Sequence, residues 1–207
     1  SDLTQYQESH SEEIMPTKTH LKLELLYNQL NVFLWLATYF FILGGLLLLM
    51  QFVALLKPAF YFKWLMVAGN ALLFAGFLYY CFGLALRWVV SGHAPWSNGY
   101  ESMIFIGWAI LLAGFLMSRK SNLVLPITGL FAGVVLMVAH LSWMNPQITN
   151  LVPVLKSYWL TLHVSVIIGG YGFLALGALL GFLNLFFTVL KTKSNNLRLQ
   201  LTIDELT

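Results

Sequence analysis

Charge is scarce in this chain of 207 residues: only 9% of its side chains are Asp, Glu, Lys or Arg, whereas 59% are hydrophobic. A soluble globular domain carries about 25% charged residues, so the composition excludes a single water-soluble domain. It also excludes intrinsic disorder, which requires low hydrophobicity and high charge. Eleven basic and eight acidic side chains leave a net charge of +3, which is too small to indicate a nucleic-acid partner.

Cysteine is equally scarce, because Cys81 is the single thiol and lies inside an apolar run. The sequence therefore predicts no internal disulfide and no thiolate metal cluster. It contains no glycine-rich phosphate loop, no paired carboxylates and no metalloprotease motif. It also lacks an initiator Met and a cleavable signal-peptide pattern, and it ends on a polar stretch, 201–207. We therefore expect it to be a piece of a longer protein.

The chain instead contains long apolar runs. About 20 apolar helical residues cross a bilayer core about 30 Å thick. Five stretches are candidates, near residues 32–56, 64–90, 102–117, 123–143 and 159–190. Each should be helical, because backbone groups in lipid must be satisfied within the segment, and none alternates as a membrane β-strand does. We predict an all-α, polytopic membrane helix bundle with about five transmembrane helices over residues 32–190.

The basic residues predict how this bundle is oriented. Seven lie on one side of the predicted spans: Lys57, Lys63, Arg119, Lys120, Lys191, Lys193 and Arg198. Four lie on the other side: Lys18, Lys22, Arg87 and Lys156. Because cytoplasmic loops carry the excess of Lys and Arg, the first side should be cytoplasmic. Residues 1–31 are then an outward-facing tail or a linker from an upstream domain, in which 21–27 could form an interfacial helix. Residues 191–207 are a cytoplasmic connector to further spans.

Tryptophan is distributed unevenly between the two sides. Five of seven lie at or near the predicted outward ends of the spans: Trp35, Trp88, Trp96, Trp143 and Trp159. An aromatic belt would explain Trp at both interfaces, but a belt should be more even than this. The alternative is an outward apolar platform that receives a flat, apolar ligand.

Three histidines, His93, His140 and His163, also map to the outward side. Counting about 20 residues back from the cytoplasmic end of the last run places His163 just outside the hydrocarbon. Each could simply hydrogen-bond to water, head groups or a neighbouring helix end. Neutral imidazole is also a good ligand for haem iron. The spans lack the deep histidine pairs of an intramembrane two-haem bundle, so the pattern disfavours such a bundle and leaves an outward-face haem site open.

The loop from His93 to Ser102 is the most distinctive segment. Pro95 and the Ser-Asn-Gly sequence at 97–99 predict a turn. Ser97 or Asn98 can cap the helix that follows, and Glu101 sits favourably in its first turn. Glu101 should face protein or water, because a carboxylate in lipid is costly. Glycines at helix-contact spacing, the pairs 129/133 and 177/181, favour close helix packing.

Two of these segments resemble a known family. The stretch Gly-His-Ala-Pro-Trp-Ser-Asn-Gly-Tyr-Glu-Ser at 92–102 resembles a loop of the CcsA/ResC haem-handling proteins of System II cytochrome c biogenesis. The stretch Leu-Val-Pro-Val-Leu-Lys-Ser-Tyr-Trp-Leu-Thr-Leu-His-Val at 151–164 resembles that family's "L-V-P-x-L-x-S-x-W-L-x-x-H-V" motif. The resemblance covers about residues 90–206. The first span and the residues before it are similar to the fused CcsB–CcsA (CcsBA-type) form found in some bacteria.

The resemblance implies a role for particular residues. The histidine of the second motif is an external haem ligand in the family, which implies that His163 is an axial ligand of a haem b iron. Trp96, Tyr100, Glu101, His140 and Trp159 would then form a supporting shell. The family's partner histidine and its Trp-rich WWD motif lie further downstream and are not in this chain, so a second axial ligand is not in it either.

The resemblance also implies a function and partners. Such proteins bind, present and possibly export haem at the outer face of the bacterial inner membrane. They help attach it to the C-x-x-C-H motif of apocytochrome c, as part of a cytochrome c synthase (haem lyase) system. The implied partners are a CcsB-like region, thiol-reducing proteins and the lipid bilayer. Two other readings stay open: a small-solute or lipid transporter, and a structural or quinone-binding subunit of a respiratory complex.

Overall fold

The computed structural model describes residues 18–56, 63–119, 121–141, 144–148, 151, 157–190, 200–201 and 203–204. Across those residues it is helical and has no strand, which confirms the all-α prediction. Six helices account for it: α2 (Lys18–Leu30), α3 (Val32–Leu56), α4 (Lys63–Ser91), α5 (Gly99–Met117), α6 (Val124–Ala139) and α7 (Tyr158–Leu190). Trp143, most of the expected tail and most of the expected connector lie outside the described residues.

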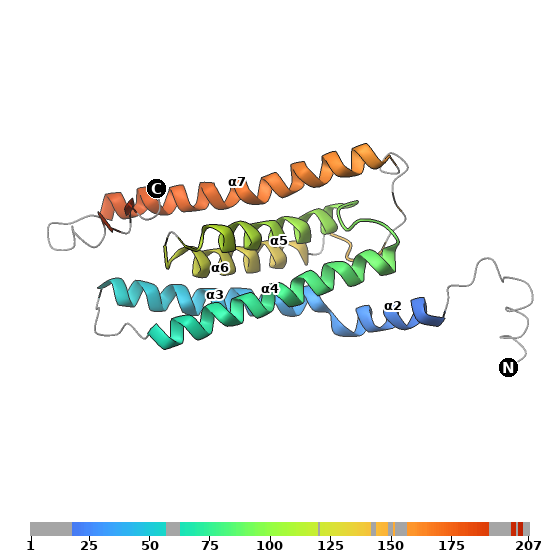
Figure 1. Ribbon diagram of the computed structural model, residues 1–207, viewed down its shortest axis with the longest axis horizontal. Coiled ribbons are helices and arrows are strands. Elements are labelled where there is room, and N and C mark those ends of the chain that lie inside the picture. Colours follow the sequence, from blue (N-terminus) through green and yellow to red (C-terminus); the bar gives the residue numbers. More distant parts are fainter. Residues whose placement is uncertain are drawn as a thin grey trace, which may run out of the picture.

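The long helices lie side by side along one axis (Figure 1). In that view α7 lies on one side, α5 and α6 are in the middle, and α3 and α4 are on the other side. Contacts join α3 to α6 and α4, and α5 to α6 and α7. The core between α3, α5 and α6 is apolar, with Phe40, Ile104 and Leu136 fully buried.

Glycines let α3 and α6 approach each other closely. A Cβ atom on Gly44 would lie 2.2 Å from the backbone nitrogen of Leu130, and one on Gly133 would lie 2.4 Å from that of Phe41. The packing role expected for the 129/133 pair is therefore confirmed. The 177/181 pair differs, because a Cβ on Gly177 or Gly181 would meet nothing within 4 Å among the described residues.

Four helical segments are long and apolar enough to cross a membrane, and α6 is a shorter apolar helix. Its 16 residues span about 24 Å at about 1.5 Å per residue. The helix ends at Ala139, earlier than the apolar run 123–143 suggests, because His140 leaves helical geometry at φ −93° and ψ 6°. From there residues 144–148 come close to α4, where the Pro146 carbonyl accepts from Arg87.

A bend at Asn31 separates α2 from α3. Asn31 has a φ of 41°, a left-handed conformation that asparagine tolerates better than most residues. The bend allows α2 to contact α4 and brings Tyr27 to Arg87. The expected helix at 21–27 is thus present within α2.

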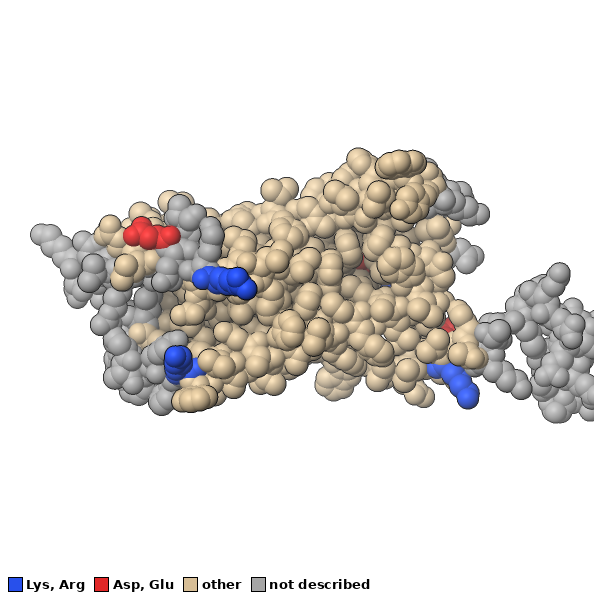
Figure 2. Space-filling model, viewed as in Figure 1, with Lys and Arg blue, Asp and Glu red and all other residues tan. Residues whose placement is uncertain are grey.

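Among the described residues, the exposed charged side chains lie towards the two ends of the molecule. On the face drawn in Figure 2, blue and red side chains lie towards both ends, and the surface between them is almost entirely of other residues. This distribution, together with the apolar helices, is that of a multi-pass membrane protein.

Candidate functional site

The most polar cluster lies at one end of the bundle, where α4 ends, α5 begins and α6 ends. We call this the α4–α5 end. Its centre is an ion pair between Arg87 and Glu101, with Nη2 of Arg87 2.9 Å from Oε1 of Glu101. Both side chains have no solvent-accessible surface. Such a pair is stable only if its remaining donors and acceptors are also met.

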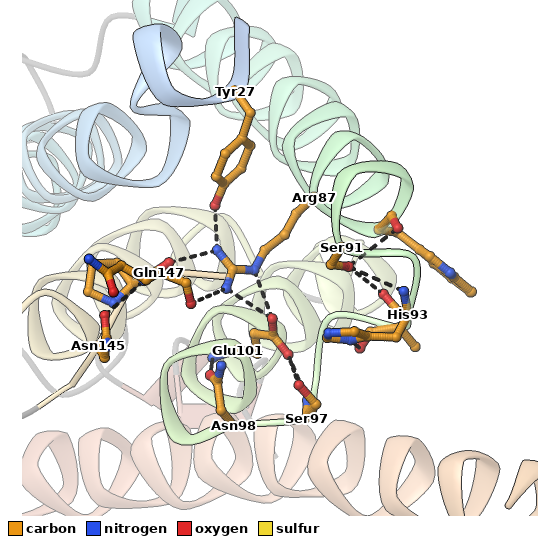
Figure 3. A network of polar contacts seen from close by, with 12 residues as sticks. Tyr27, Arg87, Ser91, His93, Ser97, Asn98, Glu101, Asn145 and Gln147 are labelled. Atoms are coloured by element: carbon orange, nitrogen blue, oxygen red, sulfur yellow. Dashed lines mark hydrogen bonds and ion pairs between the residues drawn. The ribbon is translucent and has the colours of Figure 1, made fainter. Parts of the chain in front are cut away.

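Arg87 meets that requirement with all five of its N–H donors (Figure 3). Its Nε and Nη2 both donate to Oε1 of Glu101, at 3.0 and 2.9 Å. Nη1 donates to the Tyr27 hydroxyl and, at 3.0 Å, to the Pro146 carbonyl. Nη2 also donates to the Gln147 carbonyl at 3.4 Å. A guanidinium has five N–H groups, so none is left for the carboxylate of a ligand.

Two tyrosine rings flank the same guanidinium. Its central carbon lies 5.7 Å from the ring centroid of Tyr27 and 5.2 Å from that of Tyr100. These are cation–π distances, and such contacts strengthen when water is excluded. The cation is therefore held by hydrogen bonds and aromatic contacts from α2, α5 and the 144–148 segment.

Glu101 fixes the loop between α4 and α5. Its second oxygen, Oε2, accepts from the backbone N–H of Ser97 at 2.8 Å and from the Ser97 hydroxyl. Asn98 caps α5, because its Oδ1 accepts from the backbone N–H of Glu101 at 2.8 Å. Of the two expected capping residues, Asn98 is the one that acts. Glu101 faces protein, as the cost of a carboxylate in lipid requires.

The burial of Arg87 changes the count of basic residues from which we predicted the orientation of the bundle. We counted it, near the end of the predicted span 64–90, among the charges of one side of the membrane, yet its side chain is fully buried against Glu101. A buried, neutralised arginine is not a loop charge, so it does not belong in the comparison that predicts orientation. Sequence reasoning also missed Tyr27, because nothing local to α2 reveals a partner 60 residues away.

Tyr100 contacts His140 beside this network. The Tyr100 hydroxyl lies 3.3 Å from Nε2 of His140, and the two rings meet edge-on at 5.5 Å. Nδ1 of His140 lies 2.7 Å from the Leu136 carbonyl. Both rings line a cavity of about 210 Å³.

Trp96 belongs to an aromatic cluster on another side of the α4–α5 end. Its ring centroid lies 5.6 Å from that of Trp88 and 4.9 Å from that of Phe105, and Phe105 stacks on Trp108 at 5.4 Å. These four side chains line an apolar groove of about 370 Å³ with Cys81, Leu84, Ala85, Pro95 and Ser165. Trp88 and Trp96, two of the five tryptophans of the expected platform, thus lie together in this groove. Trp35 and Trp159 lie apart from it, 69% and 76% exposed.

His163 lies near the start of α7. The side chains of His163 and Trp159 are exposed. Gly172 marks the face of α7 that packs on α5, since a Cβ there would lie 2.7 Å from Ala109. His163 precedes Gly172 by nine residues, which at about 100° per residue places it about half a turn away. The structure therefore brings Trp96, Tyr100, Glu101 and His140 to one end of the core, but His163 and Trp159 point away from it.

The exposed imidazole of His163 suits haem better than a bare metal ion. Among the described residues no group of three or more His, Cys, Asp or Glu side chains could hold a metal. Haem brings four equatorial nitrogens of its own and takes one or two axial ligands from protein. The exposed imidazole of His163 can supply one such ligand.

Comparison with known proteins places the chain among membrane proteins of one biosynthetic process. The sequence model of a family described as "Cytochrome C assembly protein" matches residues 96–207. The chain is 45% identical over 186 residues to Protein NrfI of Wolinella succinogenes, covering 90% of this chain and 21% of that protein. It is 42% identical over 113 residues to the cytochrome c biogenesis protein CcsA of Barbarea verna, covering 52% of this chain and 34% of that protein. For CcsA of Guillardia theta the identity is 37% over 120 residues, covering 56% and 40%. The chain thus spans between about a fifth and two fifths of the length of these relatives.

Proposed function

Because the chain belongs to the cytochrome c assembly protein family, we propose that it binds haem b and presents it for cytochrome c biogenesis. The single observation that carries this proposal is the family match over residues 96–207. Relatives whose names assign them to cytochrome c biogenesis match 52% and 56% of the chain. That process requires haem at the compartment where the apocytochrome is completed, so presentation rather than storage is the expected task.

The proposed location is the bacterial inner membrane, with the α4–α5 end facing outward. Without Arg87, the basic residues divide seven to three between the two sides, which strengthens the positive-inside argument. Residues 1–31 then form an outward tail or linker, and 191–207 a cytoplasmic connector. His163, near the start of α7, falls in the outer interfacial layer.

His163 is the proposed axial ligand of the haem iron. Its imidazole is exposed, so a large planar ligand can reach it without displacing packed side chains. Trp159 lies one turn earlier, on nearly the same face of α7, where it could contact the edge of the haem. When bound, haem would supply two vinyl groups to react with thiols.

The buried network around Arg87 and Glu101 has a positioning role in this proposal. Arg87 and Glu101 hold the loop at 91–98 and the segment 144–148 in place, and that segment lies on the chain's path toward α7. Trp96, Tyr100 and His140 would shape the outer surface from within the bundle. These residues position the site; only His163 is proposed to touch iron.

The proposed protein substrate is apocytochrome c with its C-x-x-C-H motif. Its two thiols would have to be reduced, so thiol-reducing proteins are expected partners. A CcsB-like region is a third expected partner. Holding haem and thiols in fixed geometry replaces a bimolecular search and accounts for much of the rate that such a synthase needs.

Replacing His163 by Ala in the full-length protein tests this proposal. We expect the variant to lose most copurified haem, measured by its absorbance, and to lower the yield of holocytochrome c. Added imidazole should restore part of both, because it replaces the missing ligand rather than a packing contact.

The matched control is His20→Ala, on α2, which should leave both readouts unchanged. Haem and cytochrome c levels in His163→Ala equal to those of the wild type would end the assignment. A purified wild-type protein without haem absorbance would instead favour a transporter or a structural subunit.

A further inference from the structure

A cavity beside Tyr100 and His140 is lined by neither of the residues proposed to contact haem, His163 and Trp159. It measures about 210 Å³ and lies where α2, α3, α5, α6 and the 144–148 segment meet. Its lining consists of Tyr27, Asn28, Asn31, Val32, Phe33, Leu34, Tyr100, His140, Pro146 and Gln147. Several polar atoms thus converge on a partly apolar space, which is how small-molecule sites are built.

The lining selects a neutral ligand. It contains no Lys, Arg, Asp or Glu. The nearby Arg87 has every N–H donor engaged within the protein. A carboxylate or phosphate seated here would lose its hydration without gaining a free cation, which is costly. The two carboxylates of haem are therefore poorly suited to this cavity.

The hydrogen bonds define what the ligand must offer. Nδ1 of His140 must carry a proton, because its partner, the Leu136 carbonyl, can only accept. In the neutral ring Nε2 is then an acceptor, and the Tyr100 hydroxyl donates to it at 3.3 Å. The Tyr27 hydroxyl accepts from Arg87, and its own proton has no acceptor in the part of the chain that the structure describes. A ligand with a hydrogen-bond acceptor would therefore take up the unused proton of the Tyr27 hydroxyl.

Arg87 makes the Tyr27 hydroxyl a stronger donor. A hydroxyl that accepts from a cation is polarised, and its own donated bond is strengthened. The preferred ligand therefore carries an acceptor oxygen, such as a carbonyl.

Size and access narrow the ligand further. A dry cavity of about 150 Å³ accommodates a benzene ring, so about 210 Å³ suits one substituted ring or a small fused pair. Leu34 lines the cavity and is 51% exposed on the apolar surface, next to Trp35. A ligand that diffuses in the bilayer can approach along that surface.

From this geometry we propose that the cavity binds the head group of a membrane quinone, with a carbonyl oxygen accepting from Tyr27. The oxidised form is favoured over the quinol, since its carbonyl oxygen can accept from the Tyr27 hydroxyl, which is itself polarised by Arg87. The proposal concerns binding alone. It does not rest on the haem proposal, because neither His163 nor Trp159 lines the cavity.

The test uses the full-length protein in lipid nanodiscs. Tetramethyl-1,4-benzoquinone, which has no tail, is titrated by calorimetry, with empty nanodiscs as the blank for partitioning. We expect one saturable site per protein and weaker binding of the corresponding hydroquinone under anaerobic conditions. Tyr27→Phe should weaken quinone binding about tenfold, the equivalent of one hydrogen bond.

Two matched pairs separate binding from folding. Leu34→Trp fills the cavity without touching the ion pair and should abolish the site, whereas Leu78→Trp, at an exposed leucine of α4 outside the lining, should not. Tyr39→Phe is the control for Tyr27→Phe, because the Tyr39 hydroxyl donates to the Leu72 carbonyl at 2.7 Å.

Several results would overturn the proposal. These are the absence of a saturable site, full binding in Leu34→Trp, and hydroquinone binding as tight as that of the quinone. Displacement of the quinone by haemin or by a short-chain phosphatidylcholine would give the cavity a different occupant. His163→Ala should leave quinone binding unchanged, so failure of the haem proposal and failure of this one are distinguishable.

Discussion

At the scale of single residues, the Arg87 guanidinium shows how a charge can be kept inside a membrane protein. A buried ion pair loses the hydration of both partners, and it is tolerated when every donor and acceptor is satisfied. Arg87 achieves this with one carboxylate oxygen, one hydroxyl and two backbone carbonyls. The same saturation makes it unavailable for binding an anion.

Removing only one partner of this pair should be strongly destabilising. Arg87→Met leaves the Glu101 carboxylate buried without a counter-ion, and breaking such a pair typically costs about 3–5 kcal/mol. We expect the double variant Arg87→Met/Glu101→Leu to regain most of that loss, because neither charge remains. The stability of both variants is measured by thermal unfolding of the detergent-solubilised protein, with its elution profile as the readout.

The control for this pair is Lys22→Met, since Lys22 is exposed on α2 and should leave the unfolding temperature unchanged. A double variant as unstable as the single one would show that the hydrogen bonds, rather than the charge balance, hold the α4–α5 end together.

At the scale of helices, Gly133 of α6 and the glycine pair 177/181 of α7 have different surroundings. Gly133 of α6 lies against the backbone of α3, where no side chain fits. A Cβ atom on Gly177 or Gly181 of α7 would contact no other described residue within 4 Å. Glycine costs a helix about 1 kcal/mol relative to alanine, and in α6 that cost is offset by the close approach of two backbones.

Alanine substitutions should separate the two kinds of glycine. Gly133→Ala places a methyl group 2.4 Å from a backbone atom of Phe41, so we expect a loss of about 1–3 kcal/mol, typical of overpacking. Gly177→Ala should be neutral or stabilise α7 by up to about 1 kcal/mol. Thermal unfolding of both variants in the same detergent makes the comparison, and equal destabilisation would show that α7 is packed on that face too.

The sequence predicts the helices well because apolar length is a local property. The runs near 32–56 and 159–190 differ from α3 and α7 by at most one residue at either end. The Asn98 cap is also local, three residues from the N–H that it binds. Arg87, by contrast, pairs with Glu101 and Tyr27 across 14 and 60 residues. The orientation of His163 depends on which face of α7 packs on α5, which the weak periodicity of an apolar helix does not reveal.

At the scale of the whole molecule, the charges at the two ends and the uncharged band between them define how the protein sits in a bilayer (Figure 2). The ends differ in character. One contains the saturated ion pair, the cavity and the aromatic groove, and the other carries exposed Lys63 and Arg119. The proposed orientation puts the first end outside the cell membrane and the second in the cytoplasm.

Cysteine labelling in intact cells tests that orientation. In a Cys81→Ala background, Ser157→Cys and Asn122→Cys each present one exposed thiol, at opposite ends of the bundle. We expect a membrane-impermeant maleimide to label Ser157→Cys in cells and Asn122→Cys only after the membrane is opened. The reverse pattern would place His163 on the cytoplasmic side and would exclude outward presentation of haem from this histidine.

Full burial of the Arg87–Glu101 pair has one further consequence, which concerns ionic strength. Dissolved ions screen exposed charges over about 10 Å at 0.1 M salt but barely reach charges inside a protein. The architecture of the α4–α5 end should therefore persist from dilute to concentrated salt. A partner that docks there through surface charges should nevertheless be released as salt rises, so a salt titration can separate loss of docking from loss of structure.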